Sequence, residues 1–501
     1  MKLSEILEHI NYTSVSTANS LTDAYITELC HDSRLAAAGC IFFCKRGAAF
    51  DGHQYAQDAY GKGVRAFVVE YTISLPPDAV MITVKNADLE LRRIASLFYG
   101  EPSRRLNVIG FTGTKGKTTC ALSVYSILNS NGISAGYIGT NGIYYCGKEI
   151  ETVNTTPDCV TLQKTLKRML DVGVTHVCLE VSSQALWQER TYGIKFHTCV
   201  FTNLYEDHIG GNEHKDMEHY RSCKRKLFSD YEVDNIVGNS DSPDFEYMVD
   251  SSPCKSICRT SARGDVGADI YAKSSMKLMS GMRPGISFEL NGSEFGKCEA
   301  FVPIPGLYSV ENALLCIGVC LKLRLELDRI IESLSHLSVS GRFETVELGG
   351  RSRSLFVIDY AHNGASLSAV LDALREYEPK RIICLFGSVG GRTYTRRRDL
   401  AEAADAKADV IIITSDNPDH EDPMLVVNDI YSNISASEKP IYLIPDRKEA
   451  IKKAYEIAED GDFILLAGKG HEKYQLIGGV RVPFSEREIL IEADTIDIAV
   501  N

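Results

Sequence analysis

The chain alternates short apolar runs with longer stretches in which apolar residues recur every three or four positions. The short runs, rich in Val, Ile, Leu and Cys, predict buried strands, and the longer stretches predict amphipathic helices. Strands that alternate with helices are typical of α/β folds with parallel sheets. The pattern therefore predicts an α/β protein.

Two breaks interrupt this pattern. At the first, an expected helix over 87–100 ends at a glycine, Pro102 stops it, and a new strand begins at Leu106. At the second, Gly341 separates a helical region from a strand-rich section. The length of 501 residues agrees with about three domains at roughly 100–200 residues per domain. The expected domains are residues 1–103, 104–340 and 341–501.

The third part contains four expected strands, and a polar loop with Gly or Asn follows each of them. In open α/β sheets, ligands bind outside the carboxyl ends of the strands, so these loops are candidate binding loops. One of them, TSDNPDHEDPM at 414–424, contains four acids, one His and two Pro. It is either a solvated turn or a selectivity loop. The strands are expected at 354–360, 381–387, 409–415 and 462–468.

The net charge of −13 argues against nonspecific binding to nucleic acid or to an anionic membrane, because both need a basic surface. The 15 Cys form no CxxC pair and many lie in apolar runs, which indicates reduced core thiols. The N-terminus lacks the continuous apolar segment of a signal peptide. We expect a cytoplasmic protein with small-molecule partners and neither a nucleic-acid nor a membrane partner.

The stretch GTKGKTT, residues 113–119, lies between an expected strand and an expected helix over 120–132. Gly113 and Gly116 let the backbone amides face an anion, and the helix N-terminus adds partial positive charge. Lys117 suits the β- and γ-phosphates, and the Thr118 hydroxyl suits Mg²⁺. Because Phe111 occupies the first Gly position of the strict P-loop pattern, an ordinary basic turn is the alternative. The context on both sides favours a nucleotide-binding loop.

Two further strand ends carry candidate ligands. The run HVCLEV, residues 176–181, includes Glu180, and the run TCVFTNLYEDHIG continues to His208. A buried acid needs a partner, and a metal ion near the phosphate loop would supply one. Each residue taken alone is more often an ordinary core or surface group, whereas their shared position on the strands after the phosphate loop favours function.

These motifs, in this order, resemble the Mur ligases, the ATP-dependent amino-acid ligases of peptidoglycan precursor synthesis. The resemblance covers the whole chain and is closest to the ligases that add the third residue to UDP-N-acetylmuramoyl-L-alanyl-D-glutamate. Its motifs are HDSR (31–34), DGHQY (51–55), GTKGKTT, NTTP (154–157), LEVSSQAL (179–186), TNLYEDHIG (202–210), YRSCKRKLF (220–228), PGLYSVENAL (305–314), GRFE (341–344), DYAHN (359–363), GGRTYTRRR (390–398), SDNPDHEDP (415–423) and GKGHEKYQ (468–475).

The resemblance implies a three-domain α/β fold, with a P-loop ATPase-type parallel sheet in the centre and a Rossmann-like C-terminal domain. It implies that ATP converts the D-Glu side-chain carboxylate into an acyl phosphate, which the amine of an incoming amino acid attacks. It also implies a monomer that uses two Mg²⁺ ions.

The resemblance further assigns residues to each site. It assigns ATP binding to Gly113, Thr114, Lys115, Gly116, Lys117, Thr118, Thr119, Asn312, Arg342, Asp359, His362 and Arg392. It assigns binding of the UDP-substrate to Ser33, Asp51, Gly52, His53, Asn154, Thr155, Thr156, Ser182 and Arg190. Metal binding falls on Thr118, Glu180, His208 and a carbamylated Lys224, and catalytic roles fall on Lys117, His208 and Lys224. It assigns binding of the incoming amino acid to Asp416, Asn417, Asp419, Gly468 and Glu472.

Position 419 bears on the choice of amino acid. Family members that use meso-diaminopimelate place Arg there to pair with the extra carboxylate, whereas this chain has Asp. An acid repels a carboxylate and attracts an ammonium, so we expect L-lysine, with ornithine or meso-diaminopimelate as alternatives.

The chain also departs from the family pattern. Gln184, Ser340 and Gly364 replace His, Pro and Pro, and Gly391 belongs to a run that lacks the usual acid. The loop after His208 is longer than the commoner version. These departures leave open a catalytically impaired, regulatory paralogue. A GTPase is disfavoured because the guanine motif Asn-Lys-x-Asp is absent, and a folylpolyglutamate-type ligase because it would lack the DNP and GKGHE pair.

Overall fold

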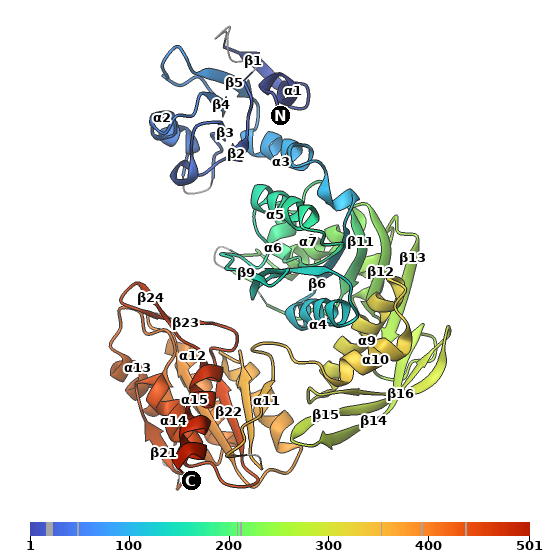
Figure 1. Cartoon of the computed structure of the whole chain (residues 1–501), viewed down its shortest axis with the longest axis vertical. Coiled ribbons are helices and arrows are strands. Elements are labelled where there is room, and N and C mark those ends of the chain that lie inside the picture. The colour runs from blue at the N-terminus through green and yellow to red at the C-terminus, as the bar shows by residue number, and fades with distance from the viewer. Residues whose placement is uncertain are drawn as a thin grey trace. The chain divides into compact units, whose positions relative to one another are not determined.

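The computed structural model describes residues 1–16, 24–47, 50–207, 209–210, 213–351, 353–391, 394–435 and 438–500. Contacts between Cα atoms divide the chain into two compact units, Met1–Cys258 and Arg259–Asn501. Figure 1 traces the chain from one end to the other. Each unit is built of helices and sheets, as the apolar pattern predicts.

The first unit begins with a five-stranded sheet in the order β1-β5-β4-β3-β2. All its pairings are parallel except that of β1 with β5. Apolar side chains of α1 and α3 pack on one face, and those of α2 on the other. The elements are α1 (Leu3–Leu7), β1 (Tyr12–Val15), β2 (Glu28–Cys30), β3 (Cys40–Phe43), α2 (Ala56–Gly61), β4 (Ala66–Val69), β5 (Val80–Val84) and α3 (Ala87–Phe98).

Seven further strands of this unit pair in the order β12-β11-β6-β10-β7-β8-β9, and the pairings are parallel from β12 to β7. Because β6 lies between β10 and β11, the carboxyl ends of three strands meet beside the start of α4. The elements are β6 (Asn107–Thr112), α4 (Lys117–Ser130), β7 (Ala135–Gly139), β8 (Gly142–Tyr145), β9 (Lys148–Ile150), α5 (Cys159–Asp171), β10 (His176–Glu180), α6 (Ser183–Trp187), β11 (Phe196–Phe201), α7 (Met217–Ser229), β12 (Val233–Asn239) and α8 (Phe245–Val249). Strand β13 (Ser256–Ser261) spans the division between the units.

The second unit contains the antiparallel strands β14 (Ile270–Ser280), β15 (Arg283–Gly292) and β16 (Gly296–Val302), with helices α9 (Leu307–Lys322) and α10 (Leu327–Ser335). A six-stranded sheet follows in the order β17-β18-β22-β19-β20-β21, parallel except for β17. Its strands are β17 (Glu344–Val346), β18 (Leu355–Asp359), β19 (Ile382–Ser388), β20 (Val410–Ser415), β21 (Ile441–Leu443) and β22 (Phe463–Ala467). A separate hairpin is formed by β23 (Tyr474–Ile477) and β24 (Val480–Pro483).

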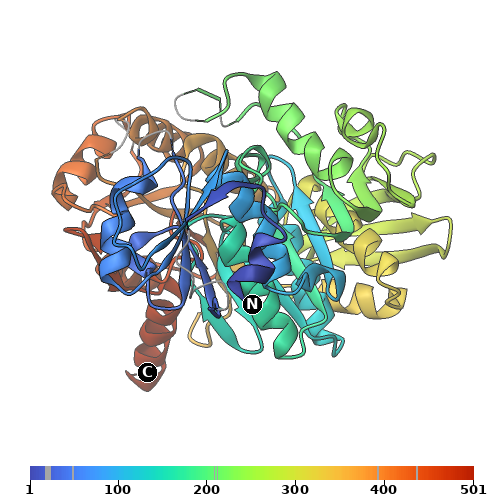
Figure 2. The same ribbon diagram turned by 90° about the horizontal axis from the view of Figure 1, so that it is seen from above.

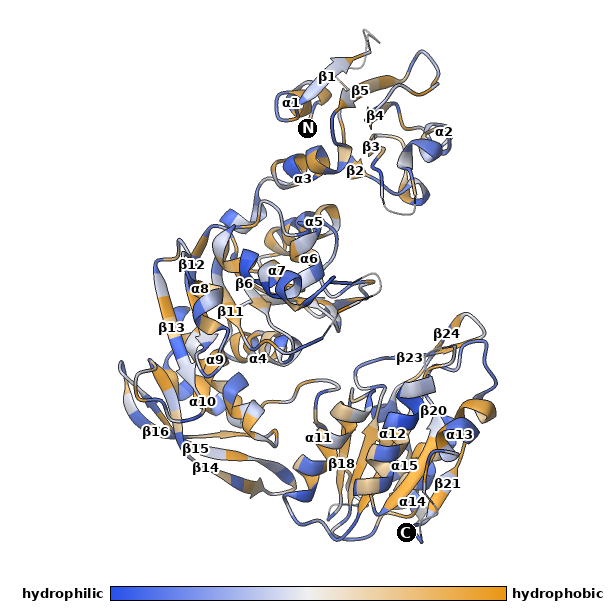
Figure 3. Ribbon diagram, turned by 180° about the vertical axis from the view of Figure 1, so that it is seen from behind, coloured by the Kyte–Doolittle hydropathy of each residue, from blue (hydrophilic) through white to orange (hydrophobic). Residues whose placement is uncertain are grey.

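Helices cover both faces of the six-stranded sheet. Apolar residues of α14 and α15 join one core with alternate residues of β18, β19, β20 and β22. Figure 3 shows strands of this sheet, β18 and β20 among them, largely in the colour of hydrophobic residues, and Figure 2 follows α15 to the C-terminus. The helices are α11 (Gly364–Arg375), α12 (Tyr394–Lys407), α13 (Pro423–Tyr431), α14 (Arg447–Glu456) and α15 (Glu486–Val500). The four strands expected from the sequence are β18, β19, β20 and β22, so that prediction is confirmed.

Most of the cysteines are buried, which agrees with the predicted core thiols. Across the described ranges, every helix is too short or too polar to cross a lipid bilayer.

Candidate phosphate and substrate sites

The phosphate loop lies between β6 and α4, as the sequence predicts. Helix α4 begins at Lys117, three residues before the expected start, so Lys117, Thr118 and Thr119 form its first turn. Gly113 adopts a φ of +147°, and a Cβ there would lie 1.9 Å from the Thr202 hydroxyl oxygen. Glycine is therefore required at this position by both backbone conformation and space.

Asn203, which the sequence analysis did not single out, holds the loop in place. Its backbone carbonyl accepts a hydrogen bond from the Thr114 amide at 2.9 Å, and its side-chain oxygen accepts one from the Lys115 amide at 2.9 Å. Asn203 lies in the quoted motif after β11, but only the sheet order shows that β11 is the neighbour of β6. The amides at the start of α4 and the nearby lysines suit an anion.

Two lysines meet at one backbone oxygen of the loop. Lys117 Nζ donates to the Gly113 carbonyl at 2.8 Å and to the Thr114 carbonyl at 3.0 Å. Lys224 Nζ, on α7, donates to the same Gly113 oxygen at 2.9 Å. Lys224 is only 1% exposed. Burial, with the charge of Lys117, lowers the pKa of Lys224 well below its usual value, which favours an uncharged amine.

Glu180 is fully buried at the end of β10, and its carboxylate accepts four hydrogen bonds. Its carboxylate accepts from the Thr118 hydroxyl at 2.8 Å, the Tyr137 hydroxyl at 2.5 Å, the Thr140 amide at 3.0 Å and the Thr140 hydroxyl at 3.2 Å. The structure thus joins two of the four predicted metal ligands, Thr118 and Glu180. Tyr137 and Thr140 were not predicted, because a buried acid implies partners without identifying them.

These oxygens next to a cluster of amides and amines fit a hard cation bound with a polyphosphate. The carboxylate and hydroxyl supply oxygen ligands, and the loop supplies donors for the phosphate. His208, the remaining predicted metal ligand and catalytic residue, lies outside the described residues.

In the N-terminal sheet, three predicted residues form one compact cluster. Asp51 accepts hydrogen bonds from the His53 amide at 3.0 Å and the Tyr71 hydroxyl at 2.8 Å, and it contacts His53 Nδ1 at 2.6 Å. Burial acts to raise the pKa of Asp51, but the hydrogen bonds from His53 and Tyr71 lower it to about 2. A Cβ at Gly52 would lie 2.8 Å from the Lys45 carbonyl oxygen, so glycine is needed there. Ser33 begins a separate 3₁₀ turn, Ser33–Leu35.

The remaining residues predicted for the UDP-substrate gather beside β10. The Thr156 hydroxyl donates to the Glu180 carbonyl at 2.8 Å and accepts from the Ser182 amide at 3.1 Å. Arg190 donates to the Thr156 carbonyl at 2.9 Å. The Thr155 hydroxyl lies 3.1 Å from that of Thr140, while Asn154 is exposed. Two predicted sites are thus linked through the neighbours of Glu180.

In the second unit, Tyr360 is the centre of a group of predicted ATP-binding residues. The Arg342 guanidinium lies 4.7 Å from the Tyr360 ring centroid, and the His362 ring lies 4.8 Å from it. Asp359 accepts hydrogen bonds from the amides of Phe343 and Ala361, both at 2.8 Å, and burial raises the pKa of Asp359. Asn312 lies separately on α9, and Arg392 is outside the described residues.

The predicted amino-acid residues Asp416, Asn417 and Glu472 surround Lys469, which is fully buried. Lys469 Nζ donates to the Asn417 side-chain oxygen at 2.9 Å and to Glu472 at 2.5 Å, and it lies 3.7 Å from Asp416. Gly468 has a φ of +113°, and a Cβ there would lie 3.0 Å from an Asp416 carboxylate oxygen. Lys469 was not predicted. Its positive charge offsets the negative charges of Asp416 and Glu472, which were predicted.

Asp419 has a role that the sequence did not reveal. It adopts a φ of +52° and its backbone pairs with the β23–β24 hairpin, donating to the Leu476 carbonyl at 2.9 Å and accepting from the Gly478 amide at 2.7 Å. Its carboxylate accepts from the Gly479 amide at 2.8 Å, and the side chain is 35% exposed. Asp419 therefore orients the hairpin as well as contributing charge.

The other acids of this loop are also bound. Glu421 pairs with Arg397 at 2.6 Å and accepts from the Gly391 amide at 2.8 Å, and Asp422 caps α13 through the Met424 amide. A Cβ at Gly390 would lie 1.9 Å from the Pro418 carbonyl oxygen. A loop held at each acid is an ordered structure, so the alternative of a plain solvated turn is disfavoured.

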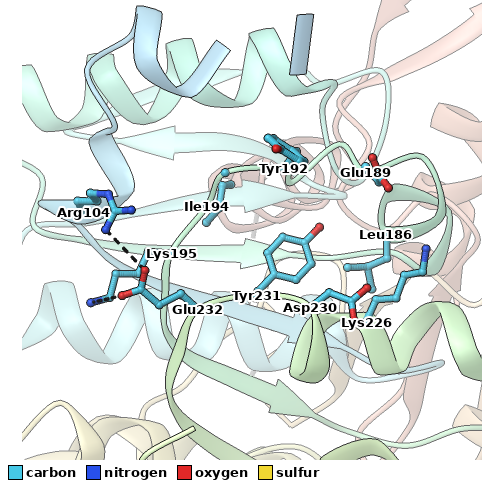
Figure 4. Close-up of a pocket in the computed structure, with 11 residues that line it drawn as sticks. Arg104, Leu186, Glu189, Tyr192, Ile194, Lys195, Lys226, Asp230, Tyr231 and Glu232 are labelled. Atoms are coloured by element: carbon cyan, nitrogen blue, oxygen red, sulfur yellow. Dashed lines mark ion pairs between the residues drawn. The ribbon is translucent and has the colours of Figure 1, made fainter. Parts of the chain in front are cut away.

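A cavity of about 400 Å³ lies elsewhere in the first unit and is drawn in Figure 4. Two of its bases pair with one of its acids: Lys195 and Arg104 lie 3.1 Å and 3.5 Å from Glu232. None of the predicted site residues lines it. The cavity is thus separate from the phosphate loop and from the predicted ligands.

Comparisons with known proteins place these sites in a family. Three family profiles match in chain order: the Mur ligase family catalytic domain at residues 25–97, the Mur ligase middle domain at 111–320, and the Mur ligase glutamate ligase domain at 341–470. Two curated relatives carry the name UDP-N-acetylmuramoyl-L-alanyl-D-glutamate--2,6-diaminopimelate ligase. The protein from Caldanaerobacter subterraneus subsp. tengcongensis is 36% identical and the one from Alkaliphilus oremlandii 37% identical, each over 98% of both chains.

A solved structure with the same name is 27% identical, with a TM-score of 0.71 over 99% of both chains. A structure named UDP-N-acetylmuramoylalanyl-D-glutamyl-2,6-diaminopimelate--D-alanyl-D-alanyl ligase, from Acinetobacter baumannii, shares the fold, with a TM-score of 0.63 at 16% identity. The chain therefore belongs to the Mur ligase family: it has the three-domain α/β fold of that family and is an ATP-dependent ligase that forms a peptide bond.

Proposed function

We propose that this chain adds a diamino acid to the D-Glu side-chain carboxylate of UDP-N-acetylmuramoyl-L-alanyl-D-glutamate. The observation that carries the proposal is its similarity, over 98% of its length, to relatives named as ligases of this substrate. We further propose that it acts in the cytoplasm as a monomer, with its substrates divided among the predicted domains 1–103, 104–340 and 341–501.

The proposed reaction has two steps. The γ-phosphoryl group of ATP passes to the D-Glu carboxylate, which gives ADP and an acyl phosphate. The amine of the incoming amino acid attacks the acyl carbon, phosphate leaves with the bonding electrons, and the amine loses a proton. Neither step needs a nucleophile from the protein, so catalysis rests on positioning and on neutralisation of charge.

The phosphate loop supplies most of that neutralisation in our proposal. The amides of residues 113–119 and the Lys117 ammonium would bind the phosphates, and the buried surroundings strengthen each charge. When bound, Mg²⁺ neutralises phosphate charge and aligns the transferred group. Thr118 and Glu180 would hold one ion, and His208 with a modified Lys224 would hold a second.

The proposed modification of Lys224 is a carbamate. An uncharged amine attacks CO₂, forms an N–C bond and loses a proton, which turns a potential cation into an anion. Support comes from the burial of Lys224 and its lowered pKa, because these keep the amine free of a proton. The nearby Lys117 is a cation that would stabilise the product.

Other contacts support assignments for each substrate. We assign the UDP-substrate to Ser33, Asp51, Gly52, His53, Asn154, Thr155, Thr156, Ser182 and Arg190. We assign the distal part of ATP to Asn312, Arg342, Asp359, His362 and Arg392. We assign the amino acid to Asp416, Asn417, Asp419, Gly468 and Glu472, with Lys469 fixing the orientation of Asn417 and Glu472.

Two observations favour different incoming amino acids. The names of the relatives favour 2,6-diaminopimelate. The acid at 419, in a loop with four acids, favours lysine, because a second carboxylate would approach negative charge without an arginine at that position. At about 4 Å and an effective dielectric constant near 20, one such charge–charge interaction is worth up to about 4 kcal/mol. We propose lysine first and 2,6-diaminopimelate second.

A panel of amino acids tests both levels of the proposal. Phosphate release is measured with the UDP-dipeptide, ATP and Mg²⁺, adding lysine, ornithine or meso-diaminopimelate in turn. We expect turnover when the UDP-dipeptide, ATP and an amino acid are all present, and we expect the highest kcat/KM with lysine. Faster turnover with meso-diaminopimelate would overturn the choice of lysine alone. Binding of ATP without turnover for any amino acid would favour the regulatory paralogue.

A further inference from the structure

Beyond the phosphate loop, two histidines and a cysteine lie together at the start of α7. Within the described part of the chain, His214, His219 and Cys223 form the one group of three such side chains whose ligand atoms all lie within 4.8 Å of one another. The two Nδ1 atoms are 3.2 Å apart. His219 and Cys223 are four residues apart on one helix, so their side chains point from the same face.

The spacing suits a tetrahedral ion. Bonds of about 2.0–2.1 Å to nitrogen and about 2.3 Å to sulfur place neighbouring ligand atoms about 3.3–3.7 Å apart. The two Nδ1 atoms, 3.2 Å apart, lie close to this spacing, and the Cys223 sulfur lies within 4.8 Å of a ligand nitrogen of each histidine. His214 and Cys223 are each 2% exposed, so bulk water competes little for the ion.

The surroundings also orient one of the ligands. His214 Nε2 lies 2.9 Å from the hydroxyl oxygen of Ser183, at the start of α6. Metal-bound imidazoles usually use their second nitrogen for a hydrogen bond of this kind, which fixes the ring and its tautomer. The contact of His214 with α6 therefore leaves its Nδ1 facing His219.

We propose that His214, His219 and Cys223 bind one thiophilic divalent cation of the Zn²⁺ type, at a site separate from the proposed Mg²⁺ site. Two nitrogens and a sulfur are soft ligands that select such ions, whereas the Thr118–Glu180 pair offers only oxygen. Binding converts the Cys223 thiol into a thiolate and releases its proton. The three side chains leave a fourth position for water or another ligand.

The site lies on a helix that also serves the phosphate loop. Tyr220, between His219 and Cys223, places its hydroxyl 3.1 Å from that of Thr114, and Lys224 follows Cys223 directly. A bound ion would fasten the segment around His214 to the first turns of α7. The proposal does not depend on the choice of amino acid or on ligase activity.

The only tryptophan of the sequence reports on this site. The Trp187 ring centroid lies 5.0 Å from that of His219 and 5.8 Å from that of His214. Co²⁺ is the probe of choice, because it quenches tryptophan emission at short range and gives a thiolate-to-cobalt charge-transfer band. We expect one equivalent of Co²⁺ to produce both signals in the full chain with Mg²⁺ present, and Zn²⁺ to reverse them.

Variants separate this site from the other thiols and imidazoles. Cys223→Ser should lose the charge-transfer band, and His219→Gln should weaken Zn²⁺ binding at least tenfold, as measured by competition with a chromophoric chelator. Ser183→Ala should weaken it about tenfold, the usual effect of losing a hydrogen bond to a ligand. The matched controls are Cys146→Ser and His336→Gln, both at exposed positions, and they should bind as the unaltered chain does.

Two results would overturn the proposal. One is the absence of a charge-transfer band from the unaltered chain at equimolar Co²⁺, a measurement that needs no variant. The other is equal Zn²⁺ affinity in the unaltered chain and in folded Cys223→Ser or His219→Gln, with folding checked by circular dichroism in metal-free buffer. Aromatic packing against Trp187 would then account for the cluster.

Discussion

Lys224 shows how much a single residue's surroundings decide. A lysine on the surface of α7 would be an ordinary cation, but this one reaches the Gly113 oxygen from a fully buried position. Removing an ammonium from water costs free energy, so the folded protein favours the uncharged amine. Burial of Lys224 therefore lowers the stability of the folded state, and the same burial makes its amine suitable for reaction with CO₂.

Replacing Lys224 should therefore separate activity from stability. We predict that Lys224→Met lowers turnover at least about 100-fold, the usual loss when a preorganised charged group is removed. In the unaltered chain the pKa of Lys224 is lowered in the folded state, so the native state binds less proton than the unfolded state. The unfavourable contribution of Lys224 to stability therefore shrinks as the pH rises toward 10.5. Lys224→Met should consequently raise Tm at neutral pH and reduce the increase in stability seen on raising the pH above neutral.

Lys226→Met, on the same helix, is the control for that experiment, and it should retain its turnover. Removal of CO₂ should lower the activity of the unaltered chain, and bicarbonate should restore it. Full activity of Lys224→Met would contradict the proposed carbamate.

Asp419 requires two substitutions, because it carries a charge and also binds the hairpin. Asp419→Asn keeps an oxygen that can accept from the Gly479 amide and removes only the charge. We predict that this change lowers kcat/KM for lysine about tenfold, which corresponds to 1.4 kcal/mol, and that Asp419→Arg lowers it further while improving use of meso-diaminopimelate. Unchanged lysine kinetics in both variants would exclude contact between position 419 and the incoming side chain.

At the scale of elements, the turn between β6 and α4 depends on the neighbouring strand β11. A methyl group at Gly113 would collide with Thr202, which follows β11, and no L-residue adopts its φ of +147° without strain. We predict that Gly113→Ala abolishes ATP binding measured by calorimetry. Gly132→Ala is the control, since Gly132 also has a positive φ but open space around it. Normal ATP affinity in Gly113→Ala would show that the turn is not required.

Helices α14 and α15 are joined by a buried ion pair. Arg447 donates to one Glu486 carboxylate oxygen from two nitrogens, at 2.8 and 2.9 Å, and both side chains are essentially unexposed. Arg447 also donates to the Ser415 and Ala467 carbonyls at the ends of β20 and β22. The pair therefore connects two helices to the strand ends that carry the candidate binding loops.

Breaking this pair should be costly, because it leaves a buried charge without its partner. We predict that Glu486→Gln lowers the free energy of unfolding by about 3–5 kcal/mol, as measured by urea denaturation. Glu488→Gln, an exposed position on the same helix, should change it by less than about 0.5 kcal/mol. Equal effects of the two changes would mean that the pair has no special role.

At the scale of the whole molecule, the apolar clusters indicate which parts can fold alone. Every member of the cluster between the six-stranded sheet and helices α14 and α15 lies within residues 341–501. We predict that a fragment of these residues folds by itself and unfolds cooperatively on heating. A fragment without a cooperative transition would argue against the domain boundary expected at Gly341.

The glycine at that boundary has a local explanation. Gly341 has a φ of +69°, and a Cβ there would lie 2.1 Å from the His471 amide nitrogen. Its carbonyl accepts from the Tyr360 amide at 3.0 Å. The sequence predicted a break at Gly341 because a helical region gives way there to a strand-rich section, whereas close packing against the GKGHE loop is what requires a glycine.

The sequence by itself determined the fold class, the four main strands of the C-terminal sheet, the phosphate loop and the family. Each of these follows from a local pattern. The spacing of apolar residues predicts the strands and helices, and the order of the short motifs indicates the family. The relatives and the sheets confirm the fold class, the strands and the family. The domain boundaries and the site residues stay predictions.

Only the tertiary structure decided which side chains meet. It brought Tyr137 and Thr140 to Glu180, Lys469 to Asp416 and Glu472, and Cys223 to His214. These partners are up to tens of residues apart in the chain, and their pairing depends on strand order and helix packing. Burial, which lowers the pKa of Lys224, is likewise a property of the assembled fold, because it depends on what covers a residue and not on its neighbours in sequence.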